Sequence, residues 1–235
     1  RSDSNESEGA ASNETVASET AAAVSQTGSV AEVADTAMPT VVAITSVSVQ
    51  EIPNYFRAFG FGYGTQQYSS EGSGSGIIVG ENDDELLIAT NNHVVSGATT
   101  LSVCFVGNDV VNAEEETVDM SGSDGDVNVE DAVSAKIKGT DESNDLAVVA
   151  VQKSDIPEDT LSQIKIAQLG NSDDLQVGEQ VVAIGNALGY GQSVTSGWIS
   201  ALNRNISTDD GTSSGLIQTD TAINPGNSGG ALLNM

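Results

Sequence analysis

Three short segments of the chain carry side chains that together could perform nucleophilic catalysis. The single histidine, His93, is followed along the chain by Asp145 and then by Ser228. A serine hydroxyl becomes a good nucleophile only when a base removes its proton, and the pKa of histidine suits that task near neutral pH. A carboxylate must then hold the imidazole in the correct tautomer. We therefore predict that Ser228 is the nucleophile, His93 the base and Asp145 the orienting group.

The order of the three residues narrows the choice of arrangement. His before Asp before Ser is the order of the chymotrypsin-type triad, and it differs from the orders in subtilisin and in the α/β-hydrolases. Asp141 and Glu142 are alternative orienting carboxylates, but Asp145 directly precedes the apolar run that begins at Leu146. Because a strand of a barrel can bury and orient a carboxylate at its end, Asp145 is the preferred candidate.

The segment around the serine, Gly226-Asn227-Ser228-Gly229-Gly230, is the most specific of the three motifs. Its glycines let the backbone turn sharply and point two N–H groups at one spot, as a tetrahedral oxyanion requires. By itself the pentapeptide also fits an ordinary glycine-rich turn. Combined with the two upstream motifs in the right order, it predicts an oxyanion hole made by the backbone N–H groups of Gly226 and Ser228.

Short apolar segments separated by turn residues recur from residue 41 onward, at intervals typical of a β-barrel or β-sandwich. The segments that we expect to be strands are residues 41–47, 77–79, 86–90, 101–106, 135–139, 146–151, 180–184, 197–202 and 215–219. One short helix precedes them, because Ser29 and Glu32 form a capping box and Pro39 ends the helical pattern. The composition therefore predicts an all-β fold.

Two segments imitate ligand-binding motifs and fail the tests for them. Residues 72–76, Gly-Ser-Gly-Ser-Gly, resemble a phosphate loop, but a strand follows where a helix is required. We expect these small residues to allow a close backbone approach at the entry to a strand. The acidic segment 107–131 imitates the start of a calcium loop, but Val129 and Ala135 occupy the positions that need glycine and glutamate. We expect no cofactor, no metal, and a solvated insertion at 107–131.

Charge and composition exclude several classes of partner. The 235-residue chain carries a net charge of −27, which disfavours binding to nucleic acid and docking on anionic lipid. Cys104 is the only cysteine, so no intramolecular disulfide forms. No run of about 18 apolar residues is present. Because the chain begins at Arg1 without a signal sequence, we expect membrane attachment only through a missing N-terminal anchor.

Aromatic residues are concentrated in residues 51–70, where glycines interleave with them. They are Tyr55, Phe56, Phe59, Phe61, Tyr63 and Tyr68. We expect a long flexible loop whose exposed aromatic cluster contacts another subunit.

Five segments of the chain resemble the HtrA (DegP/DegS) family of trypsin-like serine proteases. They are residues 90–95, 144–149, 181–186, 194–197 and 217–230. The resemblance implies two perpendicular six-stranded β-barrels with the triad in the cleft between them. It also implies ATP-independent cleavage of misfolded proteins outside the cytoplasm, at the periplasm or cell surface, and a homotrimer formed through the N-terminal aromatic loop.

The resemblance also divides the chain into parts. Residues 1–28 are expected to be a disordered tether, residues 29–155 the helix and first barrel, and residues 156–235 an incomplete second barrel, with a PDZ domain beyond the end. With the second barrel truncated, we expect this chain alone to be inactive or barely active. The position that matches the floor of the trypsin S1 pocket is Ala222, which favours small aliphatic P1 residues over Lys or Arg.

Two functions remain open at this point. The first is a serine endopeptidase of the cell envelope that degrades misfolded or damaged proteins through an acyl-enzyme. The alternative is a non-catalytic chaperone or binding scaffold on the same fold, with its oxyanion loop collapsed.

Overall fold

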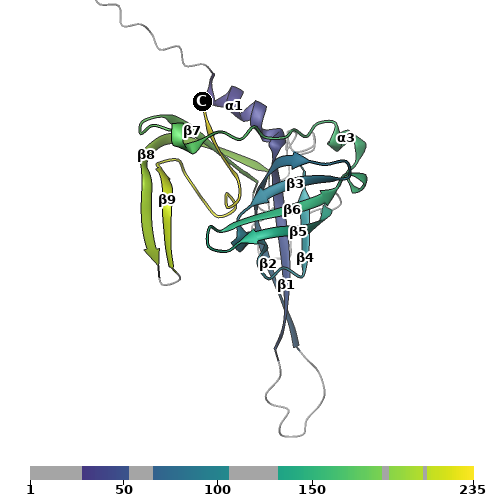
Figure 1. Cartoon of the computed structure of the whole chain (residues 1–235). Coiled ribbons are helices and arrows are strands. Elements are labelled where there is room, and N and C mark those ends of the chain that lie inside the picture. The colour runs from purple at the N-terminus through teal and green to yellow at the C-terminus, as the bar shows by residue number, and fades with distance from the viewer. Residues whose placement is uncertain (1–27, 53–65, 106–131, 187–190, 209–210) are drawn as a thin grey trace, which may run out of the picture.

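Six strands from the first two thirds of the chain close into a β-barrel, in the order β1-β2-β3-β6-β5-β4 (Figure 1). The computed structural model describes residues 28–52, 66–105, 132–186, 191–208 and 211–235. The strands of the barrel are β1 (Val41–Ile52), β2 (Gln66–Glu81), β3 (Glu85–Thr90), β4 (Thr100–Cys104), β5 (Val133–Asp141) and β6 (Leu146–Gln152).

Alternating apolar residues explain why these segments form a barrel. Along β3, Leu86, Ile88 and Thr90 are buried and their neighbours are half-buried, which is the period of two that a strand requires. The buried side chains of all six strands meet in one core. It comprises Val42, Ile44, Ile78, Leu86, Ile88, Val94, Val95, Leu101, Val103, Phe105, Val133, Ala135, Ala147, Val149, Val151 and Ile156.

The later part of the chain forms a second, open sheet in the order β10-β7-β8-β9. Its strands are β7 (Gln180–Asn186), β8 (Gln192–Thr208), β9 (Gly211–Thr219) and β10 (Ala231–Asn234). Figure 1 shows this sheet curling beside the closed barrel. The predicted fold class, an all-β fold of two barrels with the second incomplete, is confirmed.

The N-terminal helix α1 (Val30–Ala37) begins at the predicted capping box. Ser29 Oγ accepts a hydrogen bond from Glu32 N, and Glu32 Oε2 accepts one from Ser29 N. A 3₁₀ turn at Met38–Thr40, which contains Pro39, follows the helix. Although we grouped this helix with the first barrel, its buried face packs with residues of β7 and β10, among them Val182, Ile184 and Ala231. The division into residues 29–155 and 156–235 stays a prediction.

Other helical segments are short. They are α2 (Asn92–Val95), α3 (Glu158–Leu161) and 3₁₀ turns at Lys153–Asp155 and Ser172–Asp174. Within the described ranges, no helix is both long and apolar enough to cross a membrane.

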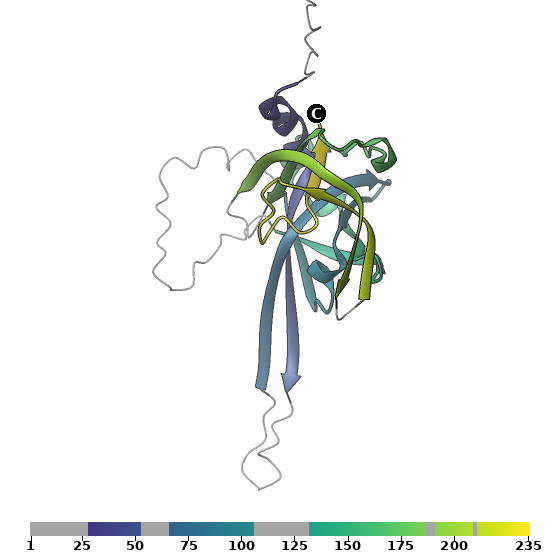
Figure 2. The same cartoon turned by 90° about the vertical axis from the view of Figure 1, so that its left-hand side faces the viewer.

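The hairpin of β1 and β2 extends well beyond the barrel (Figure 2). Pairing runs out to Ile52 and Gln66, so the ends of the predicted 51–70 loop continue as strand, and Tyr68 lies on β2. The remaining aromatics of that loop, the tether and the 107–131 insertion lie outside the described residues. The Gly72–Gly76 segment lies within β2 rather than at its entry, because β1 pairs along its whole length.

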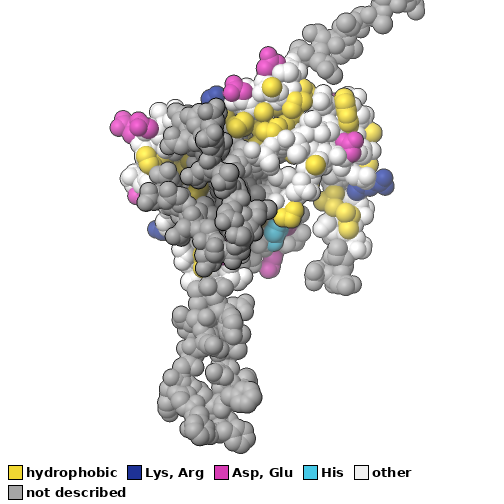
Figure 3. Space-filling model, turned by 180° about the vertical axis from the view of Figure 1, so that it is seen from behind, with side chains coloured by type: hydrophobic (Ala, Val, Ile, Leu, Met, Phe, Trp, Pro, Cys, Tyr) yellow, Lys and Arg dark blue, Asp and Glu magenta, His cyan; other side chains and the backbone are white. Residues whose placement is uncertain are grey.

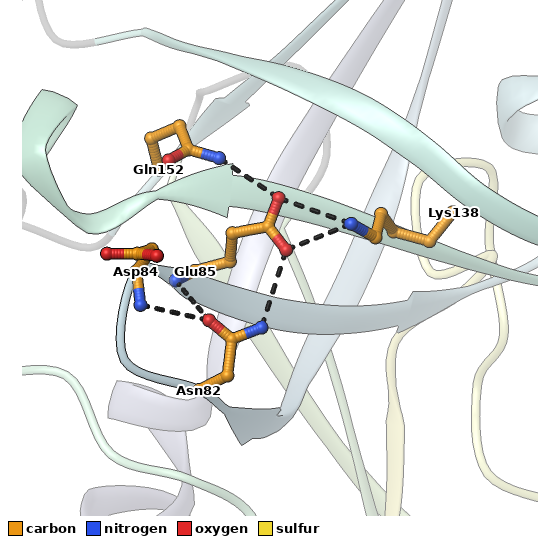
Figure 4. Close-up of polar contacts among 5 residues, drawn as sticks. All are labelled: Asn82, Asp84, Glu85, Lys138 and Gln152. Atoms are coloured by element: carbon orange, nitrogen blue, oxygen red, sulfur yellow. Dashed lines mark hydrogen bonds and ion pairs between the residues drawn. The ribbon is translucent and has the colours of Figure 1, made fainter.

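A polar cluster ties the outside of the barrel together across three strands (Figure 4). Glu85 accepts hydrogen bonds from Lys138 Nζ (2.9 and 3.3 Å), Gln152 Nε2 (3.0 Å) and Asn82 Nδ2 (3.4 Å). The hydrogen bonds from Lys138 and then from Asn82 lower the pKa of Glu85 below its ordinary value of 4.5.

Candidate active site

The predicted base and its carboxylate are brought together by two neighbouring strands. Thr90 at the end of β3 pairs with Ala147 near the start of β6, so the residues beyond these ends lie side by side. His93 follows β3 in the single turn of α2, and Asp145 directly precedes β6. Sequence spacing placed His93 at a strand end; the structure adds this one-turn helix.

Both carboxylate oxygens of Asp145 bind His93. Nδ1 of His93 lies 2.7 Å from Asp145 Oδ2, and the backbone N–H of His93 donates to Asp145 Oδ1 at 2.8 Å. A proton held on Nδ1 by this contact leaves Nε2 as the basic nitrogen. The His93 side chain is 57% exposed, so a substrate can reach it. Figure 3 shows the histidine (cyan) at the surface, between apolar and acidic side chains.

A tight turn sets the position of Asp145. The Asp141 carboxylate accepts hydrogen bonds from Ser143 Oγ (2.6 Å), Asn144 Nδ2 (2.6 Å) and the backbone N–H groups of both residues (3.1 Å each). These bonds, the one from the Ser143 hydroxyl first, lower the pKa of Asp141 from 3.8 to about 2. The turn ends with Asp145 at φ 52°, a left-handed conformation that is unusual for a non-glycine residue.

This turn also gives different roles to the three acidic residues that were candidates, from the sequence, for the partner of His93. Asp141 uses its carboxylate to organise the turn, and the Glu142 carbonyl accepts a hydrogen bond from Asp145 N at 3.4 Å. The carboxylate that contacts His93 is that of Asp145.

Ser228 lies in a turn between β9 and β10. The turn is closed by hydrogen bonds from Asn227 N to Asn224 O (3.0 Å) and from Gly230 N to Asn227 O (2.8 Å). Gly226 and Gly229 have φ values of 102° and 81°, which favour glycine. A Cβ on Gly229 would also collide with Ser75 O and Thr90 Oγ1, so this turn sits directly against the first barrel.

Hydrogen bonds from the first barrel fix the Ser228 turn near the His93 pair. Ser75 N donates to Ser228 O at 2.7 Å. Asn91 Oδ1 accepts from Gly229 N at 2.7 Å, while Asn91 Nδ2 donates to Asp145 O at 2.8 Å. One side chain, Asn91, therefore bridges the serine turn and the carboxylate turn. Neither Asn91 nor Ser75 was among the site residues predicted from the sequence.

The Ser228 hydroxyl and the two predicted oxyanion donors have no hydrogen-bond partner among the residues that the structure describes. Within the described part of the chain, Ser228 Oγ makes no hydrogen bond, to His93 or to any other residue. Over the same ranges, the N–H groups of Gly226 and Ser228 donate to no acceptor. Among the described residues, therefore, neither N–H group is committed to an acceptor.

The predicted floor of the specificity pocket, Ala222, is exposed just before the serine turn. Its carbonyl accepts hydrogen bonds from Thr195 Oγ1 (2.9 Å) and Asn227 Nδ2 (3.4 Å). The nearest acidic residue in sequence, Asp220, instead accepts a hydrogen bond from Trp198 N at 2.6 Å. Among the described residues, no group of three or more His, Cys, Asp or Glu side chains is arranged to hold a metal ion.

Comparison with known proteins shows that the chain is similar to peptidases. A family model described as "Trypsin-like peptidase domain" matches residues 74–235. The serine protease Do-like HtrB of Bacillus subtilis is 37% identical over 241 residues, covering 99% of this chain and 45% of the relative. The periplasmic pH-dependent serine endoprotease DegQ of Escherichia coli is 36% identical over 214 residues, covering 88% of this chain and 40% of the relative.

A solved structure matches as well. A variant of the HtrA-type protease AlgW with a decapeptide superposes with a TM-score of 0.62 at 32% identity, covering 88% of this chain and 55% of that chain. The chain spans less than half the length of the two curated relatives.

Proposed function

Because the chain belongs to the HtrA family of trypsin-like peptidases, we propose that it is the catalytic part of an ATP-independent serine endopeptidase. The observation that carries the proposal is the His93–Asp145 pair joined through Asn91 to the turn that holds Ser228. In this arrangement a nucleophile, a base and an orienting carboxylate lie on adjoining segments, and the N–H groups of Gly226 and Ser228 have no acceptor among the described residues.

The reaction would proceed through an acyl-enzyme. Ser228 Oγ attacks the carbonyl carbon of the scissile peptide bond as His93 Nε2 takes its proton, and the N–H groups of Gly226 and Ser228 bind the oxyanion. His93 then protonates the leaving amine, and water hydrolyses the ester by the reverse sequence of proton transfers. Asp145 stabilises the imidazolium throughout. Hydrogen bonds between base and nucleophile are often absent in free enzymes and tighten with substrate.

The substrates we propose are unfolded polypeptides with a small aliphatic P1 residue. Ala222 at the S1 floor provides no carboxylate to pair with Lys or Arg, and Asp220 is bound to the Trp198 backbone. Mass spectrometry of the products should place most cleavages of unfolded casein after Val or Ala. A majority after Lys or Arg would contradict the assignment of Ala222.

The decisive experiment is casein hydrolysis by the full natural chain and by its Ser228→Ala variant. The variant should lose hydrolysis and keep binding. Equal hydrolysis by both proteins would exclude the catalytic assignment. Binding without hydrolysis by the wild type would favour the non-catalytic scaffold, for which the missing hydrogen bond between Ser228 Oγ and His93 is the supporting observation.

The cellular setting we propose is extracytoplasmic, in quality control of misfolded proteins, with membrane attachment through an N-terminal anchor. It is supported by the periplasmic designation of the Escherichia coli relative. We also propose a homotrimer formed through residues 51–70, on the basis of the family resemblance. Sedimentation equilibrium of the protein with residues 29 onward intact should give a trimer, and a monomer would contradict it.

The 235-residue chain alone should have little activity. Among the described strands, β10 pairs with β7 alone, and large apolar side chains such as Leu232 (42% exposed) face solvent. An open sheet positions the serine turn less firmly than a closed barrel does. Casein hydrolysis by this chain should therefore be far slower than by a form extended at its C-terminus, and equal specific activities would refute this expectation.

A further inference from the structure

We propose that Ser75 is the positioning residue of the oxyanion hole, holding Gly226 and Ser228 in the orientation that binds the oxyanion. The proposal rests on the proposed peptidase function. It also gives a role to the glycine–serine segment of β2, which the sequence identified as unusual without assigning it to the site.

Every polar atom of Ser75 is used, and the residue is fully buried. Its Oγ donates to the carbonyl of Gly226 at 2.6 Å and accepts from Asn186 N at 2.7 Å. Its backbone N–H donates to the Ser228 carbonyl at 2.7 Å, and its own carbonyl accepts from Thr90 Oγ1 at 2.7 Å. One residue of the first barrel thus holds the carbonyls of both predicted oxyanion donors.

The direction of the Ser75 hydroxyl is fixed by its neighbours. A hydroxyl has one proton to donate, and the N–H of Asn186 occupies an acceptor site on Oγ, so the O–H is free to point at Gly226. Because the contact is buried, water does not compete with it and the hydrogen bond is stronger than at the surface. The contact is therefore directional and persistent.

Gly226 needs such an anchor more than another residue would. Glycine rotates freely about φ and ψ, and Gly226 adopts φ 102°. Without a fixed carbonyl, the peptide planes on either side of Gly226 can turn and carry its N–H away from the oxyanion position. The Ser75 hydroxyl fixes the plane between Gly226 and Asn227, which restricts this rotation at the donor.

The glycine beside Ser75 makes the contact possible. A Cβ on Gly74 would lie 2.8 Å from both methyl groups of Val94 and 3.0 Å from Ser228 O. A side chain there would push the serine turn off β2. The absence of a side chain at Gly74 therefore leaves room for the Ser228 turn beside β2, and Ser75 forms hydrogen bonds with that turn.

The test is the kinetics of Ser75→Ala in the full natural chain, with Ser46→Ala as matched control. Ser46 is another buried serine, on β1, whose Oγ donates to the Gly72 carbonyl at 3.3 Å, away from the serine turn. We expect kcat of Ser75→Ala to fall about tenfold to a hundredfold, because losing an oxyanion donor outright costs about 10²–10³. KM should stay within about twofold, and Ser46→Ala should keep the wild-type kcat.

A peptide aldehyde ending in valinal tests whether Ser75 positions the oxyanion hole specifically or only supports the structure around it. Ser228 Oγ adds to the aldehyde carbon as its proton passes to His93 Nε2, the C=O double bond becomes a single bond, and the resulting oxyanion occupies the oxyanion hole. Affinity for this aldehyde should weaken in Ser75→Ala by the same factor as kcat/KM. Binding of a substrate peptide in the Ser228→Ala background should be unchanged when Ser75→Ala is added. Equal loss of peptide and aldehyde binding, or wild-type kcat in folded Ser75→Ala, would overturn the proposal.

A second pair of variants covers the case in which Ser75→Ala does not fold. Thr and Val are nearly isosteric and differ in a hydroxyl against a methyl group, so the ratio of kcat for Ser75→Thr to that for Ser75→Val reports the two hydrogen bonds of the hydroxyl, to Gly226 O and from Asn186 N. We expect Thr to exceed Val by at least about tenfold, and a ratio near one refutes the role of the hydroxyl. If Ser228→Ala keeps full hydrolysis, the peptidase function itself fails, which is a different outcome from either result at Ser75.

Discussion

The closed barrel and the open sheet hold their parts of the site by different means. In the barrel, every strand pairs on both sides around one buried core, whereas β9 and β10 each have one edge that pairs with no other described strand. Large apolar side chains with substantial exposure gather in the second part of the chain. They include Leu169, Val177, Trp198, Ile206, Ile223 and Leu232, against Ile137 and Leu146 in the barrel.

Because of this difference, the base and the nucleophile are held in position in different ways. His93 and Asp145 are placed by the ends of two adjacent strands of the closed barrel, and they contact each other directly. Ser228 lies between two strands of the open sheet, and its turn accepts a hydrogen bond from Ser75 N and donates one, through Gly229 N, to Asn91 Oδ1. The barrel therefore positions the base by its own packing and positions the nucleophile by contacts that cross between the two sheets.

The largest expected effect is a loss of kcat when the His93–Asp145 pair, which the closed barrel positions, is altered. Asp145→Asn should lower kcat by about 10⁴, because the amide can donate to Nδ1 and stabilise the wrong tautomer of His93. Steady-state hydrolysis of a peptide substrate measures it. Glu142→Gln, at one of the rejected carboxylates, is the control and should keep the wild-type rate. A similar loss in both variants would show that the turn, and not the Asp145 carboxylate, matters.

The stability of the two sheets should differ when equivalent core residues are truncated. Ile88 on β3 and Ile184 on β7 are both almost fully buried. We expect Ile88→Ala to lower the free energy of unfolding by about 4 kcal/mol and Ile184→Ala by about 2 kcal/mol, because the open sheet can collapse around the cavity.

Urea unfolding can follow the two sheets separately. Trp198, the only tryptophan, lies on β8, so its fluorescence reports the second sheet, while far-ultraviolet circular dichroism reports all strands. The fluorescence transition should come first. Coincident transitions and equal losses for Ile88→Ala and Ile184→Ala would abolish the contrast between closed and open sheets.

The sequence predicted the strands well where burial alternates within one segment. The strand at 86–90 is an example, since its apolar residues alone define the buried face. It failed at residues 66–70, predicted as loop, because those polar residues become strand only through pairing with β1. Pairing between segments is a tertiary effect that local composition does not reveal.

The same limit separates the site residues that the sequence identified from those it missed. His93, Asp145 and Ser228 stood out because their chemistry and order are distinctive. Asn91 and Ser75 acquire roles only through contacts 138 and 151 residues away in sequence, with Gly229 and Gly226. A polar residue beside a candidate base and a serine between glycines were the signals available, and neither specifies a partner.

A smaller effect is expected from removing the bridge between the two sheets. Asn91→Ala should lower kcat by about tenfold to a hundredfold, since the serine turn and the Asp145 turn lose their shared partner. The KM for a peptide substrate should change little. Asn171→Ala is the control, because the Asn171 side chain accepts a hydrogen bond from the nearby Asp173 N, away from the site. An unchanged kcat in Asn91→Ala would mean that the serine turn needs no support from the base side.

The smallest effect concerns acid stability of the barrel. Asp141 has its pKa lowered from 3.8 to about 2 by hydrogen bonds from Ser143 and Asn144, so the folded state favours its ionised form. A lowered pKa stabilises the fold above the ordinary value, and that contribution is lost as the pH falls from about 4 to about 2. In Asp141→Asn, which cannot titrate, the melting temperature should fall less steeply over this window than in the wild type. Glu85→Gln should flatten the curve near and below pH 4.5 for the same reason, through the loss of its pairing with Lys138. If melting temperature against pH runs parallel to the wild-type curve in both variants, these two carboxylates do not make the barrel acid-sensitive. The difference in stability between the closed barrel and the open sheet then rests on packing alone.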